Sequence, residues 1–350
     1  MRIFRFVKAF FKSSPKQFIM RAGAGIYIGE LKLSYYFITF GIFVIILAIV
    51  CSPQTYIAAF SMGLQTWAKI LLPTIFPLIF FTKLLTDLGV LNTVANRLTF
   101  TQKLFKTPPI SAYAFMVSIL SGYPVGAKVV SDLFTDGYIT KNQAIKICTF
   151  TSNSGPMFIY GSVGISMLCS RTLGLVMLIS HILSAICNGL LYRNYLVSPS
   201  IQDVKLQTKP KFSLSTTMTD SILSILLIGG FVSIFFVVIE LFNQAHIFVP
   251  IANFLGEFLG LDSQIILGIL NGIVEMTHGC LDITACGLSP AALTIICTGL
   301  ITFGGLATML QAYAFFQKIG IKIGFFLAQK ITQTIFACVI CALLLWILGT

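Results

Sequence analysis

Two runs of small and polar residues interrupt an otherwise apolar sequence, at Leu120–Lys128 (LSGYPVGAK) and Thr149–Pro156 (TFTSNSGP). Lipid cannot hydrogen-bond free backbone N–H and C=O groups, so a broken helix persists at membrane depth only where protein or a wet cavity surrounds it. In transporters built from two related halves, breaks at corresponding places indicate the substrate site. We therefore expect a second set of breaks, with a site between the two sets.

The composition indicates an all-α polytopic membrane protein. The chain is 57% hydrophobic and only 10% charged, whereas soluble domains carry about 25% charged residues. The net charge of +12 is interpreted as a topology signal on cytoplasmic loops, not as a nucleic-acid-binding surface. The nine cysteines lie mostly in apolar runs and are expected to pack as small hydrophobic residues. We expect no metal site and no cofactor beyond a coupling Na⁺ or H⁺.

The apolar runs predict the membrane crossings. A retained first span at Leu33–Val50 follows a basic segment, residues 1–32, that is expected to be cytoplasmic. Tyr56–Met62 could lie in the interface. The further predicted crossings are Trp67–Leu85, Met157–Cys169, Thr172–Leu191, Ser221–Ile239 and Phe325–Leu348, with a broken run at Ala291–Met309.

Residues 111–156 predict a re-entrant hairpin. Ser111–Leu120 is apolar but has about half the length that a crossing needs. Asp136–Gly137 predicts a turn, and Thr140 with Gln143 forms a capping-box pattern that opens a short helix. The chain is thus expected to dip into the bilayer and return to the same side.

A second half repeats this plan. Leu120–Gly122 (LSG) matches Leu270–Gly272 (LNG), and Ser154–Gly155 falls on Gly304–Gly305, both at a spacing of 150 residues. Seven Lys or Arg lie between Lys83 and Lys146, whereas none lies from 212 to 317. The positive-inside rule therefore places the two hairpins on opposite sides. The predicted architecture is two inverted repeats, each of about three transmembrane helices plus a re-entrant hairpin, after one extra N-terminal span. Its segments are 1–32, the first span 33–55, repeat 1 (56–196), a cytoplasmic linker 197–217 and repeat 2 (218–350).

The hairpin tips supply the candidate substrate-binding residues. From the first half these are Ser121, Gly122, Tyr123, Gly126, Lys128, Thr151, Ser152, Asn153, Ser154 and Gly155. From the second half they are Asn271, Glu275, Thr277, Thr302, Gly304, Gly305 and Gln311.

Charged candidates within this set have two or more interpretations each. Lys128 either binds an anionic ligand or reaches the cytoplasmic interface as a topology marker. Glu275 either holds a coupling ion together with His278, pairs with Lys128, or lies in an outer loop. His181, alone in an apolar span, is expected to be packed and hydrogen-bonded.

The run from Leu120 to Gly164 (LSGYPVGAK…TFTSNSGPMFIYGSVG), with GIVEMTHGC and TFGG in the second half, resembles the sporulation integral membrane protein YlbJ family, also called the stage V sporulation protein V family. These are nucleoside-recognition Gate domain membrane proteins. The resemblance implies a transporter that moves dipicolinic acid, a small aromatic dicarboxylate, across the outer forespore membrane. It also implies a distant likeness to nucleoside transporters with paired re-entrant hairpins. Site residues carry over at Ser121–Lys128, Asn153–Pro156 and Glu275.

Three functions remain open from the sequence. The first is a secondary transporter or facilitator for a small organic anion in the cell membrane, with the N-terminus cytoplasmic, or in the outer forespore membrane if the organism forms spores. The second is a cation-coupled nucleoside or nucleobase transporter. The third is a non-transporting scaffold or sensor with an envelope partner or a second copy of the chain. No P-loop, H-E-x-x-H motif or nucleophile elbow is present, so we expect no enzyme.

Overall fold

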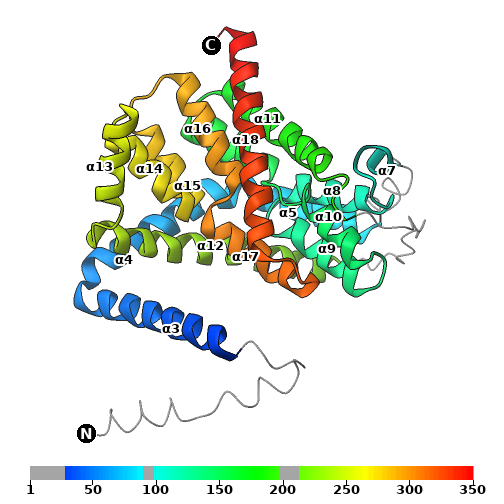
Figure 1. Cartoon of the computed structure of the whole chain (residues 1–350), viewed down its shortest axis with the longest axis horizontal. Coiled ribbons are helices and arrows are strands. Elements are labelled where there is room, and N and C mark those ends of the chain that lie inside the picture. Colours follow the sequence, from blue (N-terminus) through cyan, green and yellow to red (C-terminus); the bar gives the residue numbers. More distant parts are fainter. Residues whose placement is uncertain (1–27, 90–97, 99, 197–212, 350) are drawn as a thin grey trace, which may run out of the picture. The chain divides into compact units, whose positions relative to one another are not determined.

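The computed structural model describes residues 28–89, 98, 100–196 and 213–349, and every regular element in these ranges is a helix (Figure 1). The chain divides into two units, residues 1–53 and 54–350. The first unit contributes α3 (Ile28–Cys51), which covers the predicted first span. The basic segment before residue 28 and most of the predicted linker, residues 197–212, lie outside the described ranges.

Five helical segments in the described residues are long and apolar enough to cross a membrane. They are Pro53–Leu85, Arg171–Leu191, Leu214–Gln244, Pro290–Ile319 and Ile323–Leu348. The predicted crossings in these regions are confirmed as apolar helices, and the chain is a multi-pass membrane protein. The run at Met157–Cys169 differs, because η2 (Met157–Met167) has 11 residues. At about 1.5 Å per residue this falls well short of the ~30 Å hydrocarbon core.

The segment predicted to lie in the interface forms the start of a longer helix. Three helices follow one another without a gap: α4 (Pro53–Thr66), the π-helical η1 (Trp67–Leu71) and α5 (Leu72–Asp87). Pro53 is tolerated because the first helical residue needs no intrahelical N–H bond. The π-helical turn ends just before Pro73, as expected where a proline disturbs the regular ladder.

Two pairs of short helices occupy the predicted hairpins. The first helix pair is α8 (Ser111–Ser121) and α9 (Val125–Thr135). It is followed by α10 (Lys141–Cys148), a non-helical break over residues 149–155, η2 and α11 (Arg171–Leu191). The predicted capping box is confirmed: the Thr140 side chain accepts from the Gln143 N–H, and the Gln143 side chain accepts from the Thr140 N–H.

The second half contains elements in the same order. After α12 (Leu214–Gln244) and α13 (Phe248–Leu259), the second helix pair is α14 (Ser263–Val274) and α15 (Met276–Thr284). Then α16 (Pro290–Phe303), a break at Gly304, α17 (Gly305–Ile319) and α18 (Ile323–Leu348) complete the chain. This order supports the predicted repeat, while the inversion of its second copy stays a prediction.

Each half contributes side chains to the other half's core. In the first core, α17 packs against α9, with Phe316 buried among side chains of the first helix pair. In the second core, η2 packs against α15, with Phe158 and Ile159 beside Met276. Because α17 and η2 both follow the break in their own half, the exchange is reciprocal.

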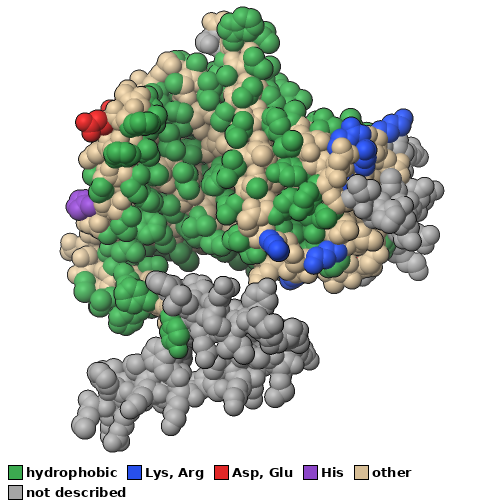
Figure 2. Space-filling view, in the orientation of Figure 1, with side chains coloured by type: hydrophobic (Ala, Val, Ile, Leu, Met, Phe, Trp, Pro, Cys, Tyr) green, Lys and Arg blue, Asp and Glu red, His purple; other side chains and the backbone are tan. Residues whose placement is uncertain are grey.

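Charged side chains gather at different ends of residues 54–350. In the view of Figure 2, Lys and Arg lie on the side of α7 (Phe100–Phe105) and α9, and an acidic group lies on the side of α13. The separation agrees with the charge pattern of the sequence, since residues 212 to 317 contain no Lys or Arg.

Candidate functional site

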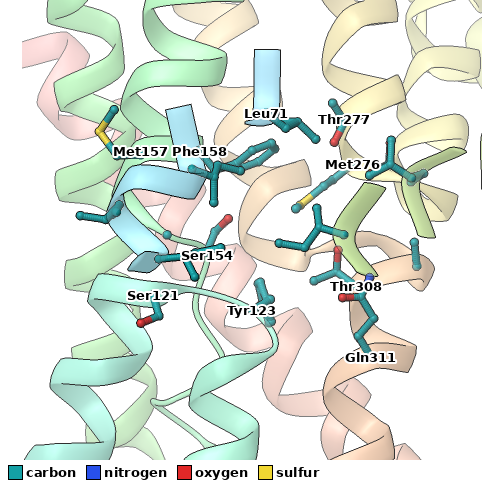
Figure 3. A pocket seen from close by; sticks show the side chains of 18 of the residues that line it. Leu71, Ser121, Tyr123, Ser154, Met157, Phe158, Met276, Thr277, Thr308 and Gln311 are labelled. Carbon is teal, nitrogen blue, oxygen red and sulfur yellow. The ribbon is translucent and has the colours of Figure 1, made fainter. Parts of the chain in front are cut away.

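A small cavity lies between the two helix pairs and is lined by Ser154 and Gly155 of the first break and by the start of α17 (Figure 3). About 60 Å³ of it is open to the centre of a water molecule, which is room for about four waters at ~10–15 Å³ each. Most of the wall is apolar, from α5, α12 and η2. The polar lining consists of Ser121, Tyr123, Ser154, Glu275, Thr277, Thr308 and Gln311. In this conformation the cavity does not have room for a drug-sized ligand, for which pockets of about 300 Å³ or more are typical.

The tip of the first helix pair depends on a pair of glycines. Gly122 has φ +71° and ψ −162°, a conformation that residues other than glycine essentially never adopt. A methyl group on Gly122 would lie 2.4 Å from the Gly155 backbone nitrogen. The equivalent contact exists in the second half, where a Cβ on Gly305 would lie 3.1 Å from the Gly272 carbonyl oxygen. Close glycine contacts thus join each helix pair to the break that follows it.

His181 ties the two breaks together, and the prediction that it is packed and hydrogen-bonded is confirmed. Its Nε2 accepts from the Ser154 N–H at 3.0 Å, and its Nδ1 lies 2.9 Å from Thr302 Oγ1. The ring is 1% exposed. The tautomer that accepts at Nε2 carries its proton on Nδ1, so Thr302 accepts the second bond.

Lys330 of α18 is the buried cation of the site, and sequence reasoning missed it. It is fully buried, and its Nζ donates to Tyr123 Oη, to the Ser152 carbonyl at 3.0 Å and to Gln333 Oε1 at 3.1 Å. Gln333 in turn donates to Asn153 Oδ1 at 3.0 Å. No ion pair among the described residues includes Lys330. The available signal was an ionisable residue inside a predicted span, which by default indicates a functional site.

Lys128 lies elsewhere, and its partner is not the predicted Glu275. Its ammonium binds Asp132 at 3.1 Å, and both side chains are more than half exposed. The predicted pairing with Glu275 is therefore wrong. Lys128 is one turn inside α9, on the face opposite buried Ala127 and Val130, so the helix directs it outward.

Glu275 is almost fully buried and lines the cavity at the start of α15. Its Oε2 accepts from the His278 N–H at 2.8 Å, which caps the helix. A carboxylate at a helix N-terminus also interacts favourably with the helix dipole. These contacts hold the side chain at the cavity wall, so the predicted loop position for Glu275 does not apply.

The remaining predicted residues fall into three groups. Gly126, Thr151 and Gly304 lie where the backbone is closely packed. A Cβ on Gly126 would meet the Thr151 carbonyl oxygen, and a Cβ on Gly304 would meet Tyr123 Oη. Ser152, Asn153 and Thr302 belong to the buried network around Lys330 and His181. Asn271 and His278 do not line the cavity but face a second, polar opening on the other side of α15.

One curated protein gives a match over most of the chain. The sporulation integral membrane protein YlbJ of Bacillus subtilis (strain 168) is 24% identical over 328 residues, which cover 85% of this chain and 79% of that protein. No protein-family model and no solved structure matches. The match covers most of the chain, so the resemblance expected from the SGYPVGAK and NSGP runs is confirmed. This chain is therefore similar over most of its length to sporulation integral membrane protein YlbJ.

Proposed function

We propose that this protein is a secondary transporter or facilitator for a small organic anion, bound between the two helix pairs. The observation that carries the proposal is Lys330, a buried amine whose hydrogen-bond partners among the described residues are all neutral groups. A buried charge without a counter-charge is costly. An anionic ligand that enters the site would supply the missing negative charge.

Tyr123 lies between Lys330 and the cavity. Its ring lines the cavity, and its hydroxyl accepts from Lys330 Nζ. The ammonium itself does not reach the cavity wall. We infer that the Tyr123 side chain moves aside when substrate enters, so that a carboxylate replaces the phenol oxygen as the partner of Lys330. The small cavity volume then corresponds to a conformation without room for substrate.

The class of substrate follows from this arrangement. The site offers one lysine, Lys330, together with the hydroxyl groups of Ser121 and Thr308 and apolar walls from α5 and α12. These features suit a small carboxylate with an apolar or aromatic body. Dipicolinate is the first candidate, because the resemblance to the YlbJ family implies it. Glu275 and Gln311 also line the cavity, and their hydrogen-bonding groups favour a nucleoside as the second candidate.

The test is uptake of labelled dipicolinate, compared with a panel of nucleosides, by proteoliposomes that contain the purified protein. The informative variant is Lys330→Gln, which keeps a donor but removes the charge. The matched control is Lys128→Gln, at the exposed lysine. A hydrogen bond to a charged group contributes about 1.5–3 kcal/mol, so Lys330→Gln should raise the KM for the anion by about 10- to 150-fold.

The control should transport like the wild type. Gel filtration and wild-type-like thermal unfolding establish that each variant is folded. Uptake of nucleosides without anions would favour the second candidate. If folded wild type moves neither, or if Lys330→Gln leaves the KM for the anion unchanged, the proposal is wrong.

A further inference from the structure

A second opening lies beside the cavity, on the other side of the first turn of α15. About 480 Å³ of it is open to the centre of a water molecule. Its polar lining consists of Asn243, Asp262, Gln264, Asn271, His278 and Asp282. Among the described residues, two carboxylates and no Lys or Arg line it, so its potential favours protons and cations. Neither the cavity nor the proposed anion site accounts for this opening.

A hydrogen-bonded trio forms the inner wall of the opening. Asp282 Oδ2 accepts from Asn271 Nδ2 at 2.8 Å and lies 3.0 Å from His278 Nδ1. The Asp282 side chain is 30% exposed and that of His278 is 14% exposed. Asn271 is buried and lines the opening, yet its Oδ1 has no hydrogen-bond partner. A buried acceptor without a partner, in a residue that lines a polar opening, indicates a place for a hydrogen-bond donor such as a water molecule.

His278 connects this trio to Glu275. The His278 N–H donates to Glu275 Oε2 at 2.8 Å, so the two residues occupy the cap and third positions of α15, and their charges interact. The Glu275 carboxylate and the His278 imidazole thus both belong to the capped first turn of α15. Glu275 lines the cavity, whereas His278 lines the opening. One helical turn therefore separates the two spaces.

The titratable groups that interact with His278 are Asp282 and Glu275. The elements packed around it contribute mainly apolar or neutral side chains. From α12, the Phe236 ring lies 4.5 Å from the imidazole, centroid to centroid. From α16, Cys297 interacts with Cys280 of α15, and η2 contributes apolar Phe158 and Ile159 to the same core. From α14, Asn271 is neutral, and Asp262 at the start of that helix lines the same opening.

We propose that Asp282 and His278 relay protons from the second opening to Glu275, and that protonation of Glu275 couples a proton gradient to anion transport. A water-borne proton binds Asp282 or the imidazole, and an N–H bond then breaks as the O–H bond of the Glu275 acid forms. The ring regains its proton from the opening, and Glu275 releases its own proton to the other side after the site reopens. The inference rests on the proposed anion site.

The charge of the site explains why coupling would follow. With Glu275 ionised, its carboxylate lines the cavity and repels an incoming anion. With Glu275 protonated, this repulsion is absent. Proton binding and anion binding therefore favour each other, and by linkage the effect is reciprocal. The expected process is proton–anion symport.

The experiment compares two assays in the same proteoliposomes. The first is exchange of labelled for unlabelled anion without a gradient, which needs the anion site alone. The second is accumulation driven by a pH gradient imposed in either direction, with an internal pH dye to report proton entry with the anion. The variants are His278→Gln and Asp282→Asn, and the matched control is His246→Asn, at an exposed histidine in the loop before α13.

Wild type and the control should accumulate anion and acidify the vesicle lumen. The two relay variants should exchange anion at near wild-type rates but lose accumulation and anion-dependent proton entry by at least tenfold. Exchange also reports that each variant is folded, and because the relay needs both residues, either variant alone carries the test. Exchange with unchanged proton entry in the variants, or accumulation driven by Na⁺ instead of protons, overturns the relay. Absence of anion exchange in folded wild type overturns the proposed function, and the relay with it.

Discussion

Replacement of Gly122 by alanine should destabilise the protein more than the same change at Gly137 or Gly155. The backbone at Gly122 (φ +71°, ψ −162°) costs a residue with a side chain about 1–3 kcal/mol. The added methyl would also lie 2.4 Å from the Gly155 nitrogen and 2.8 Å from the Gly155 Cα, both backbone atoms. Such overpacking costs about 1–3 kcal/mol more. The expected loss in unfolding free energy is therefore about 2–6 kcal/mol.

The two other glycines separate these contributions. Gly137 has φ +77°, and a methyl group there would meet no atom within 4 Å, so Gly137→Ala should cost only the backbone part, about 1–2 kcal/mol. Gly155 has no such φ, and a methyl there would meet its nearest atom, the Ser121 carbonyl oxygen, at 3.5 Å. Gly155→Ala should therefore change stability by less than about 0.5 kcal/mol.

The assay is reversible unfolding in mixed micelles, with SDS titrated against a non-ionic detergent and helicity followed by circular dichroism. The reasoning predicts the order Gly122→Ala, then Gly137→Ala, then Gly155→Ala, from most to least destabilised. Equal losses at positions 122 and 137 would show that the contact between the helix pair and the following break is looser than these distances indicate. A large loss of stability in Gly155→Ala would refute the reasoning, because a methyl group on Gly155 is expected to fit whereas one on Gly122 is not.

Two further predictions follow from the site and from the repeat. Tyr123→Phe removes the oxygen that accepts a hydrogen bond from Lys330. Because a hydrogen bond to a charged group is lost, the unfolding free energy should fall by about 1.5–3 kcal/mol, measured in the same titration. A change below about 0.5 kcal/mol would contradict that bond. Cysteines introduced at exposed Asp136 and Ala285, in a background without the native cysteines, should react with a membrane-impermeant maleimide from opposite sides of inside-out and right-side-out vesicles. Labelling of both from one side would exclude the inverted repeat.

Local backbone requirements were predictable from the sequence. The breaks at Gly122 and Gly304 need conformations with positive φ, and glycine is the residue that adopts them. The Thr140–Gln143 capping box was likewise readable, because both of its hydrogen bonds lie within four consecutive residues. Long apolar runs predicted the spans for the same reason, since length and hydropathy are local properties.

The composition of the candidate site was only partly predictable. Lys330 joins it through contacts with Tyr123 and Ser152, which lie 207 and 178 residues away in sequence. No local pattern encodes such a contact. Lys128 shows the opposite error: it stands in the most distinctive motif of the chain, yet the orientation of α9 turns its side chain toward solvent, where it binds Asp132. Motif membership and helix orientation are separate properties, and only packing decides the second.

The reciprocal exchange of η2 and α17 has a consequence for how the chain is made. During synthesis, the first helix pair leaves the ribosome long before Phe316 and Phe326 exist to fill its core. The core of the amino-terminal half therefore stays incompletely packed after membrane insertion, until almost the whole chain has been translated. Two fragments divided within the 197–212 connection and expressed separately should each be degraded, whereas their joint expression should restore a stable, functional complex.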